Sequence, residues 1–276
     1  MQRVFCCLRK ISLIFFCCIF MLPHLMSKAN AIQTVPPNNG MRIPTLNKMG
    51  DMLLYLDEIT TAFIDQSDPA RGPILDVGCA YGYISSLCLE KELTVTALDI
   101  EPRHIAVLEE QTLNHHKKRL TTVVNRFPDH TPFEDNTFQH ILVARVFNFM
   151  DDHQTAAAAK KLYQWLKPGG KVFVTVESPY LKYWLNFVQY FEARKKAGVE
   201  APGLLTDPHH IAPTRSPYFP DMLNFHDPDT LSQFFIDAGF KIETCHFISR
   251  PEFPEALRHD GRESVGLIAV KPDLMR

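Results

Sequence analysis

The most constraining feature of the sequence is a short apolar stretch that ends near an acid and then turns through small residues. Residues 73–77 are apolar except for Asp76, and Gly78, Ala80 and Gly82 follow at alternate positions before a helical pattern begins. This order predicts a strand, a tight turn and a helix. Residues without bulk let main-chain N–H groups approach a ligand, and a helix N-terminus favours a negatively charged group. The turn is therefore the first candidate for a ligand site.

Strands and helices are predicted to alternate beyond this turn. The further strands are expected at 93–98, 120–125, 140–146 and 171–176. The helices are expected at 49–65, 102–114 and 155–166. Such alternation predicts a parallel sheet covered by helices on both faces. A helix at 229–238 is then followed by two strands, 241–248 and 264–271, and the lack of a helix between them favours an antiparallel pair at one sheet edge.

Residues 178–223 interrupt this plan as an insertion on the side where the substrate is expected. A helix is predicted at 180–197, and a proline-rich loop follows it. The helix also contains Tyr190, and its aromatic stripe consists of Tyr183, Trp184, Phe187 and Phe191. This stripe is compatible with core packing and with a wall for an apolar or aromatic substrate, because insertions at this sheet edge usually shape what binds there.

An acid closes the second predicted strand. Asp99 lies 17 residues beyond Gly82, and a carboxylate at this place offers two acceptor oxygens to the vicinal hydroxyls of a ribose. Strand, glycine turn, helix, strand and acid in this order predict a ligand that carries a ribose. The turn spacing is Gly-x-Ala-x-Gly, which disfavours a nicotinamide dinucleotide.

Three stretches resemble a known family. Asp76-Val-Gly-Cys-Ala-Tyr-Gly82 resembles motif I of the class I S-adenosylmethionine (SAM)-dependent methyltransferases. Pro132-Phe-Glu-Asp-Asn-Thr-Phe138 and Trp165-Leu-Lys-Pro-Gly-Gly170 resemble stretches of the small-molecule group often called type 11. The resemblance spans about residues 70–272 apart from the insertion. It implies an α/β, three-layer, Rossmann-like fold, with a mostly parallel seven-stranded sheet and an antiparallel C-terminal strand.

The resemblance also implies which residues bind SAM. The turn would surround the methionine part and the sulfonium, Asp99 would take the ribose hydroxyls, and Ile100 would pack on the adenine. An acid that often follows the third strand is missing, and Phe127 and Pro128 stand there, with Asp129 nearby. The expected cofactor-binding residues are Asp76, Gly78, Cys79, Ala80, Gly82, Asp99, Ile100, Phe127, Pro128 and Arg145.

The catalytic residues are less well defined by the sequence. A hydroxyl acceptor would be helped by a base, for which His209, His210 and His226 are weak candidates, and Asn148 or Arg145 could orient the substrate. No metal is expected. The seven cysteines include four in the N-terminal apolar segment, and the scattered Cys79, Cys88 and Cys245 form neither a disulfide framework nor a zinc motif.

The N-terminus reads as an export signal. Basic residues precede an apolar run over 11–22, and Ala29-Asn-Ala31 provides a small-residue cleavage site. We expect a signal peptide at 1–31, a linker and helical cap at 32–69 and a methyltransferase domain at 70–276. The protein would then be exported, periplasmic or secreted. An uncleaved membrane anchor is the alternative, and this segment would be the only membrane contact.

Charge argues against nucleic acid as a partner. The first 31 residues hold 4 basic residues and no acid, so the rest of the chain carries about −6. The expected function is methyl transfer from SAM to a small-molecule or lipid-like acceptor. The alternative is an exported SAM-fold binding protein without turnover. The sequence does not predict the oligomeric state.

Overall fold

The computed structural model describes residues 42–129, 131, 133–213 and 220–273. The chain divides into two units, Met1–Pro36 and Pro37–Arg276, and every described residue lies in the second. The predicted signal peptide therefore lies outside the described residues. Within the described residues, no helix is both long and apolar enough to cross a membrane.

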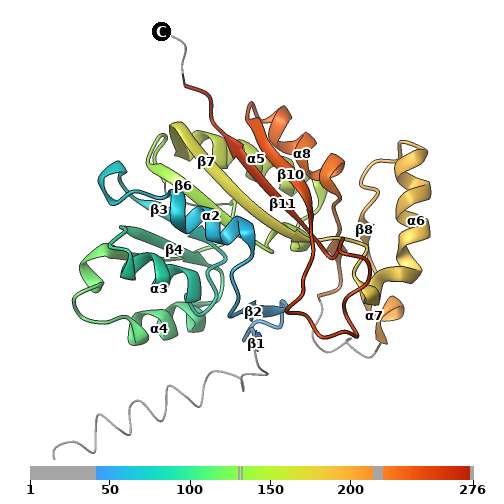
Figure 1. Ribbon diagram of the computed structural model, residues 1–276, viewed down its shortest axis with the longest axis horizontal. Helices are drawn as coiled ribbons and strands as arrows, with labels where there is room; N and C mark the ends of the chain where they lie inside the picture. The colour runs from blue at the N-terminus through green and yellow to red at the C-terminus, as the bar shows by residue number, and fades with distance from the viewer. Residues whose placement is uncertain (1–41, 130, 132, 214–219, 274–276) are drawn as a thin grey trace, which may run out of the picture. The chain divides into compact units, whose positions relative to one another are not determined.

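A seven-stranded sheet in the order β10-β11-β7-β6-β3-β4-β5 organises the second unit (Figure 1). Its strands are β3 (Ile74–Val77), β4 (Val95–Asp99), β5 (Leu120–Val124), β6 (Phe138–Ala144), β7 (Leu166–Glu177), β10 (Lys241–Ile248) and β11 (Ser264–Val270). The pairs from β7 to β5 are parallel, and β11 is antiparallel to both of its neighbours. The predicted α/β class, the single antiparallel strand and the β10–β11 pair at one edge are confirmed.

Helices cover both faces of this sheet (Figure 1). On one face lie α2 (Glu58–Gln66), α3 (Tyr83–Glu90) and α4 (Pro102–Gln111), and on the other α5 (Asp152–Trp165) and α8 (Pro228–Asp237). The buried β-branched and aromatic residues of the central strands fill both layers, because strands covered on both faces need apolar side chains on both. The carboxyl ends of β3, β4, β6 and β7 remain as the edge on which ligands bind in such folds.

The segment before α2 corrects the sequence prediction. A helix was expected from residue 49, but a hairpin forms instead, with β1 (Arg42–Pro44) antiparallel to β2 (Asp51–Leu53). Arg42 donates from Nε to Asp51 across the two strands, at 3.1 Å. The helix begins only after Asp57, whose side chain caps it by accepting from the Thr60 N–H at 2.9 Å. The apolar spacing of Met52 and Leu53 therefore reflects a cavity wall and not a helix face.

Two further boundaries differ from the prediction. The expected turn at 167–170 belongs to β7, which pairs with β6 through a register shift between Phe138 and His140. The insertion helix α6 covers Leu185–Lys196 and follows a 3-10 turn, η4, at Lys182–Trp184. The insertion adds a short antiparallel pair of β8 (Leu204–Leu205) and β9 (Leu223–Asn224), together with α7 (Pro208–Ile211).

The insertion has a core of its own. Trp184 and Phe191 are fully buried, and Phe187 is almost so, in a cluster with Phe225. The Trp184 and Phe225 ring centres lie 5.0 Å apart. Core packing therefore accounts for most of the aromatic stripe, whereas Tyr190 is exposed.

Gly82 provides a test of how the first turn is packed. An added Cβ would lie 2.3 Å from Cδ1 of the buried Leu108 on α4, and the φ of Gly82 is +79°. We expect Gly82→Ala to lower the free energy of unfolding by about 3 kcal/mol, from left-handed strain plus overpacking. Gly198→Ala is the matched control, because its φ is +65° and nothing lies within 4 Å. The control should lose only about 1 kcal/mol in urea unfolding; equal losses would contradict the packing argument.

Candidate functional site

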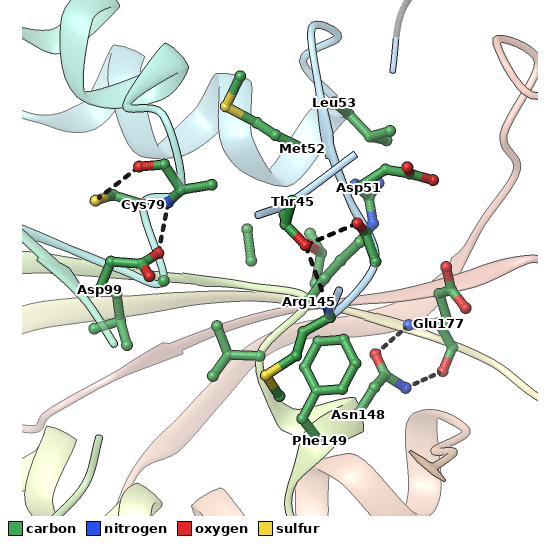
Figure 2. A pocket seen from close by; sticks show the side chains of 18 of the residues that line it. Thr45, Asp51, Met52, Leu53, Cys79, Asp99, Arg145, Asn148, Phe149 and Glu177 are labelled. Carbon is green, nitrogen blue, oxygen red and sulfur yellow. Dashed lines mark hydrogen bonds between the residues drawn. The ribbon is translucent and has the colours of Figure 1, made fainter. Parts of the chain in front are cut away.

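A cavity of about 380 Å³ lies at the carboxyl ends of β3, β4, β6 and β7 (Figure 2). It is lined by the first turn on one side and by residues of the insertion on the other. Eight of the expected cofactor-binding residues line it: Asp76, Gly78, Cys79, Ala80, Asp99, Ile100, Phe127 and Arg145. The structure thus brings together residues that are up to 69 positions apart in the sequence.

Two expected cofactor residues are not part of this lining. Gly82 instead caps α3 in the left-handed conformation and packs against α4. Pro128 follows Phe127 but does not line the cavity, and neither does Asp129. Asn125 lines it at this point and was not among the predicted residues, because an acid is the residue type expected after the third strand.

The turn itself alternates left-handed residues. Gly78, Ala80 and Gly82 have φ values of 72°, 46° and 79°. An added Cβ at Gly78 would lie 2.4 Å from Cγ2 of Val146, so only glycine fits there. The small residues thus serve a sharply folded main chain that brings the turn close to the strand ends.

The sequence predicted that main-chain N–H groups of this turn face a ligand, and the structure corrects this prediction. The N–H groups of Gly78 and Cys79 both donate to the Leu98 carbonyl, at 2.7 and 3.1 Å. The Ala80 N–H donates to Asp99 Oδ2 at 2.8 Å, and the Gly82 N–H to the Cys79 carbonyl at 2.8 Å. These four donors are used inside the protein. A ligand at this turn meets carboxylates and apolar surface instead.

Asp99 is held from three directions. Besides Ala80, its Oδ1 accepts from the Glu101 N–H at 2.8 Å and contacts His104 Nδ1 at 3.1 Å. The Leu46 N–H donates to Nε2 of the same imidazole, at 3.0 Å, so Nδ1 carries the proton and donates to Asp99. A carboxylate has about four acceptor positions, so this network leaves Asp99 with capacity for a further donor. Its orientation is fixed by the protein.

The same network attaches the β1–β2 hairpin to the site. The Tyr81 hydroxyl donates to the Pro44 carbonyl at 2.8 Å, and Arg103 donates to the Leu46 carbonyl at 3.1 Å. The Tyr81 ring also meets the His104 ring edge-on, with centres 4.8 Å apart. The hairpin therefore forms one wall of the cavity, next to the turn.

Asp76 supplies a second buried carboxylate. Its side chain is only 4% exposed, and Ser85 donates to it at 2.7 Å. Burial, opposed in part by the Ser85 hydrogen bond, raises the pKa of Asp76 from 3.8 to about 6. Burial also raises the pKa of the neighbouring Cys79 thiol, which stays neutral. At neutral pH Asp76 is therefore mainly ionised, and it lies in the same wall of the cavity as Asp99.

Asn148 is a structural residue. Its side-chain amide donates to the carbonyls of Glu177 and Asn224, at 3.0 and 2.9 Å, and its oxygen accepts from the Glu177 N–H at 2.9 Å (Figure 2). Three of its four hydrogen-bonding positions are thus used to join β7 to β9. These bonds position the cavity wall, and they leave Asn148 one acceptor position for the substrate that it is expected to orient.

The three histidines considered as bases do not line the cavity. His209 lies 3.4 Å from Asp221, and the N–H of His210 donates to Asp207 in the capping of α7. His226 is buried against Phe234, and burial lowers its pKa to about 4. The histidine that does line the cavity, His104, was missed because its role depends on a contact with a residue 58 positions away.

Apolar side chains form much of the rest of the lining, beside the charged residues Arg42, Asp51, Asp57, Arg145 and Glu177. The apolar residues are Met52, Leu53, Phe149, Leu181, Tyr183, Trp184, Leu223, Phe253 and Leu257. Tyr183 and Trp184 belong to the insertion, so the aromatic stripe contributes to this wall as well as to the core. Within the described residues, no group of three or more His, Cys, Asp or Glu side chains has the arrangement of a metal site.

Comparison with known proteins agrees with this geometry. Residues 74–170 match the family model described as a methyltransferase domain. A ubiquinone/menaquinone biosynthesis C-methyltransferase, UbiE, from Agrobacterium fabrum is 32% identical over 127 residues, which are 44% of this chain and 47% of that protein. Residues 74–170 therefore form a methyltransferase domain. The chain spans about half the length of this curated relative.

Solved structures support the fold. A SAM-dependent methyltransferase from Methanosarcina mazei has a TM-score of 0.59 at 19% identity, covering 79% of this chain and 99% of that one. The glycopeptide N-methyltransferase MtfA complexed with SAM has a TM-score of 0.53 at 16% identity, covering 77% and 86%. A geranyl diphosphate methyltransferase in complex with GPP and sinefungin has a TM-score of 0.54 at 12% identity, covering 77% and 76%. At these identities the likeness extends to the fold.

The pKa of Asp76 leads to a test on the ligand-free protein. Between pH 4 and 6 the carboxyl ionises in the unfolded chain before it does in the folded protein, so rising pH destabilises the fold over this window. Urea unfolding of wild type and Asp76→Asn across pH 4–8 should show the wild type losing up to about 3 kcal/mol relative to the variant. The difference should stay constant above the window. Ser85→Ala should move the window to higher pH, and parallel profiles would contradict the assignment.

Proposed function

We propose that the protein transfers a methyl group from SAM to a small-molecule or lipid-like acceptor with a large apolar part. The observation that carries this proposal is one cavity with two unlike halves. Asp76 and Asp99 flank the first turn, and apolar side chains of the hairpin, the insertion and the segment after β10 line much of the rest of the cavity. The matched methyltransferase domain contributes the first half and Phe149 of the second, and the insertion, the hairpin and the segment after β10 contribute the rest of the second.

The residues near the turn fit the cofactor. Ile100 is 39% exposed at the cavity, which leaves an apolar side chain available to pack on an adenine ring. Asp99 is oriented by His104 and Ala80 so that it can accept from a ribose hydroxyl. The Asp76 carboxylate lies where it can balance a positive charge on the ligand.

Chemically, this cavity suits a reaction that needs positioning more than acid catalysis. Bound SAM supplies a methyl group on a positively charged sulfur. The chain aligns the acceptor for in-line attack and excludes water, for which the apolar wall with Phe149 and Trp184 is suited. The names of two similar proteins, a quinone-biosynthesis C-methyltransferase and a geranyl diphosphate methyltransferase, support an apolar acceptor.

Calorimetry with SAM, S-adenosylhomocysteine and NAD tests this function. We expect the first two to bind, and Asp99→Ala to weaken SAM binding by about 1.5–3 kcal/mol, the scale of hydrogen bonds to a charged group. Glu101→Gln is the matched control, because Glu101 is the neighbouring acid but does not line the cavity. Binding of NAD alone would refute the proposal. Binding of SAM without product from any acceptor would support the alternative of a binding protein.

We further propose that residues 1–31 are an export signal that is cleaved after Ala31. The basic segment, the apolar run and the small-residue ending support this proposal. Edman sequencing of exported protein should then begin at Ile32. A start at Met1 in the membrane fraction would identify the segment as an anchor instead.

A further inference from the structure

Arg145 differs from the other arginines around the cavity. It follows β6 directly, has a φ of 58°, and its N–H donates to the Thr175 carbonyl on β7 at 2.8 Å. These features fix its backbone in a left-handed conformation at the strand end, and Figure 2 shows the residue between the Asp99 side and the Glu177 side of the cavity. Arg145 is therefore held at the junction of the two halves.

The guanidinium of Arg145 has no acid bound to it. Within the described part of the chain it forms no ion pair or side-chain hydrogen bond, and its Cζ lies 6.0 Å from the centre of the Phe253 ring. By contrast, Arg42 pairs with Asp51 across the hairpin. Arg126, the third arginine of the lining, is exposed, so among the arginines that line the cavity in the described part of the chain Arg145 is the one that is both partly buried and unpaired.

Arg250 shows how the fold treats a neighbouring guanidinium. It is 1% exposed and donates from Nη1 to Asp57 at 2.8 Å. Its Nε also lies 2.6 Å from Glu252, although this contact is poorly aligned for a hydrogen bond. Asp57 and Glu252 are thus occupied by Arg250. Glu177 is the remaining acid near Arg145, and the two are not in ion-pair contact.

A partly buried guanidinium without a bound acceptor is costly unless something else binds it. Burial, together with Arg250, lowers the pKa of Arg145 to about 9, so the group is still a cation at neutral pH. A guanidinium offers parallel N–H donors that match the two oxygens of a carboxylate. Because acids lie nearby, the region around Arg145 has no broad positive potential. Recognition of a carboxylate therefore depends on the two parallel N–H donors of the guanidinium.

We propose that Arg145 binds a carboxylate of a ligand inside the cavity. This inference rests on the proposed function and narrows it. The carboxylate has two sources: the amino-acid end of the cofactor, or an acid group on the acceptor. In the second case the acceptor joins an apolar body, which contacts Phe253 and its neighbours, to a carboxylate at Arg145.

The test compares ligands with and without the carboxylate on the full chain. S-adenosylhomocysteine, 5′-methylthioadenosine and benzoate are each titrated calorimetrically into wild type, Arg145→Gln and Arg145→Lys. Benzoate is titrated into protein that is already saturated with S-adenosylhomocysteine. Methylthioadenosine is the same nucleoside without the amino-acid end. Glu177→Gln is the matched control, because it removes a charge of opposite sign from the same wall and should not weaken the binding of any anionic ligand. Thermal unfolding checks that each variant is folded, and the lysine variant keeps the charge if the glutamine variant does not fold.

If the cofactor supplies the carboxylate, Arg145→Gln weakens the binding of S-adenosylhomocysteine by about 10- to 100-fold and leaves the affinity for methylthioadenosine unchanged. If the acceptor supplies it, both nucleosides bind as in wild type and the variant loses benzoate binding. Arg145→Lys falls between wild type and glutamine in either case, because it keeps charge but not the fork.

Equal affinities of wild type and both Arg145 variants for all three ligands overturn the inference. Failure of wild type to bind either nucleoside instead overturns the proposed function. Benzoate binding to the ligand-free protein then decides the inference separately, and binding that does not depend on Arg145 overturns it.

Discussion

The hydrogen bonds of Asp99 hold the site together. One carboxylate joins the first turn through Ala80, the start of α4 through Glu101 and the β1–β2 hairpin through His104. Each of these bonds is buried or partly buried, where an unsatisfied partner would cost about 1–3 kcal/mol. Asp99, which the sequence predicts as a ligand-binding residue, therefore also holds the surrounding segments of the protein together.

The main chain of the turn bonds within the protein, whereas the nearby carboxylates face the cavity. The small residues allow the main chain to fold back so tightly that four of its N–H groups donate to Leu98, Cys79 and Asp99. What remains toward the cavity is negative charge from Asp76 and Asp99 and an apolar surface from Ile100. This surface suits a ligand with a positive centre and a flat apolar ring, and it suits a phosphate poorly, because a phosphate needs free donors.

The sequence was sufficient for the fold and for the half of the cavity formed by local patterns. The spacing of apolar residues in a strand or a helix depends on which face is buried. The sheet, its antiparallel strand and the position of Asp99 could therefore be predicted from that spacing. Contacts between distant residues have no such periodicity. The bond from Leu46 to His104 and the capping of α2 by Asp57 turned an expected helix into a hairpin. The bonds of Asn148 likewise depend on a partner 76 positions away.

The hairpin also bears on where the functional unit begins. The segment that matches the methyltransferase family starts at residue 74, but Thr45, Met49, Met52 and Leu53 line the cavity from outside that segment. A fragment cut at the family boundary would keep the turn and lose one wall, together with the partner of His104. A fragment that keeps the complete cavity therefore has to include the hairpin.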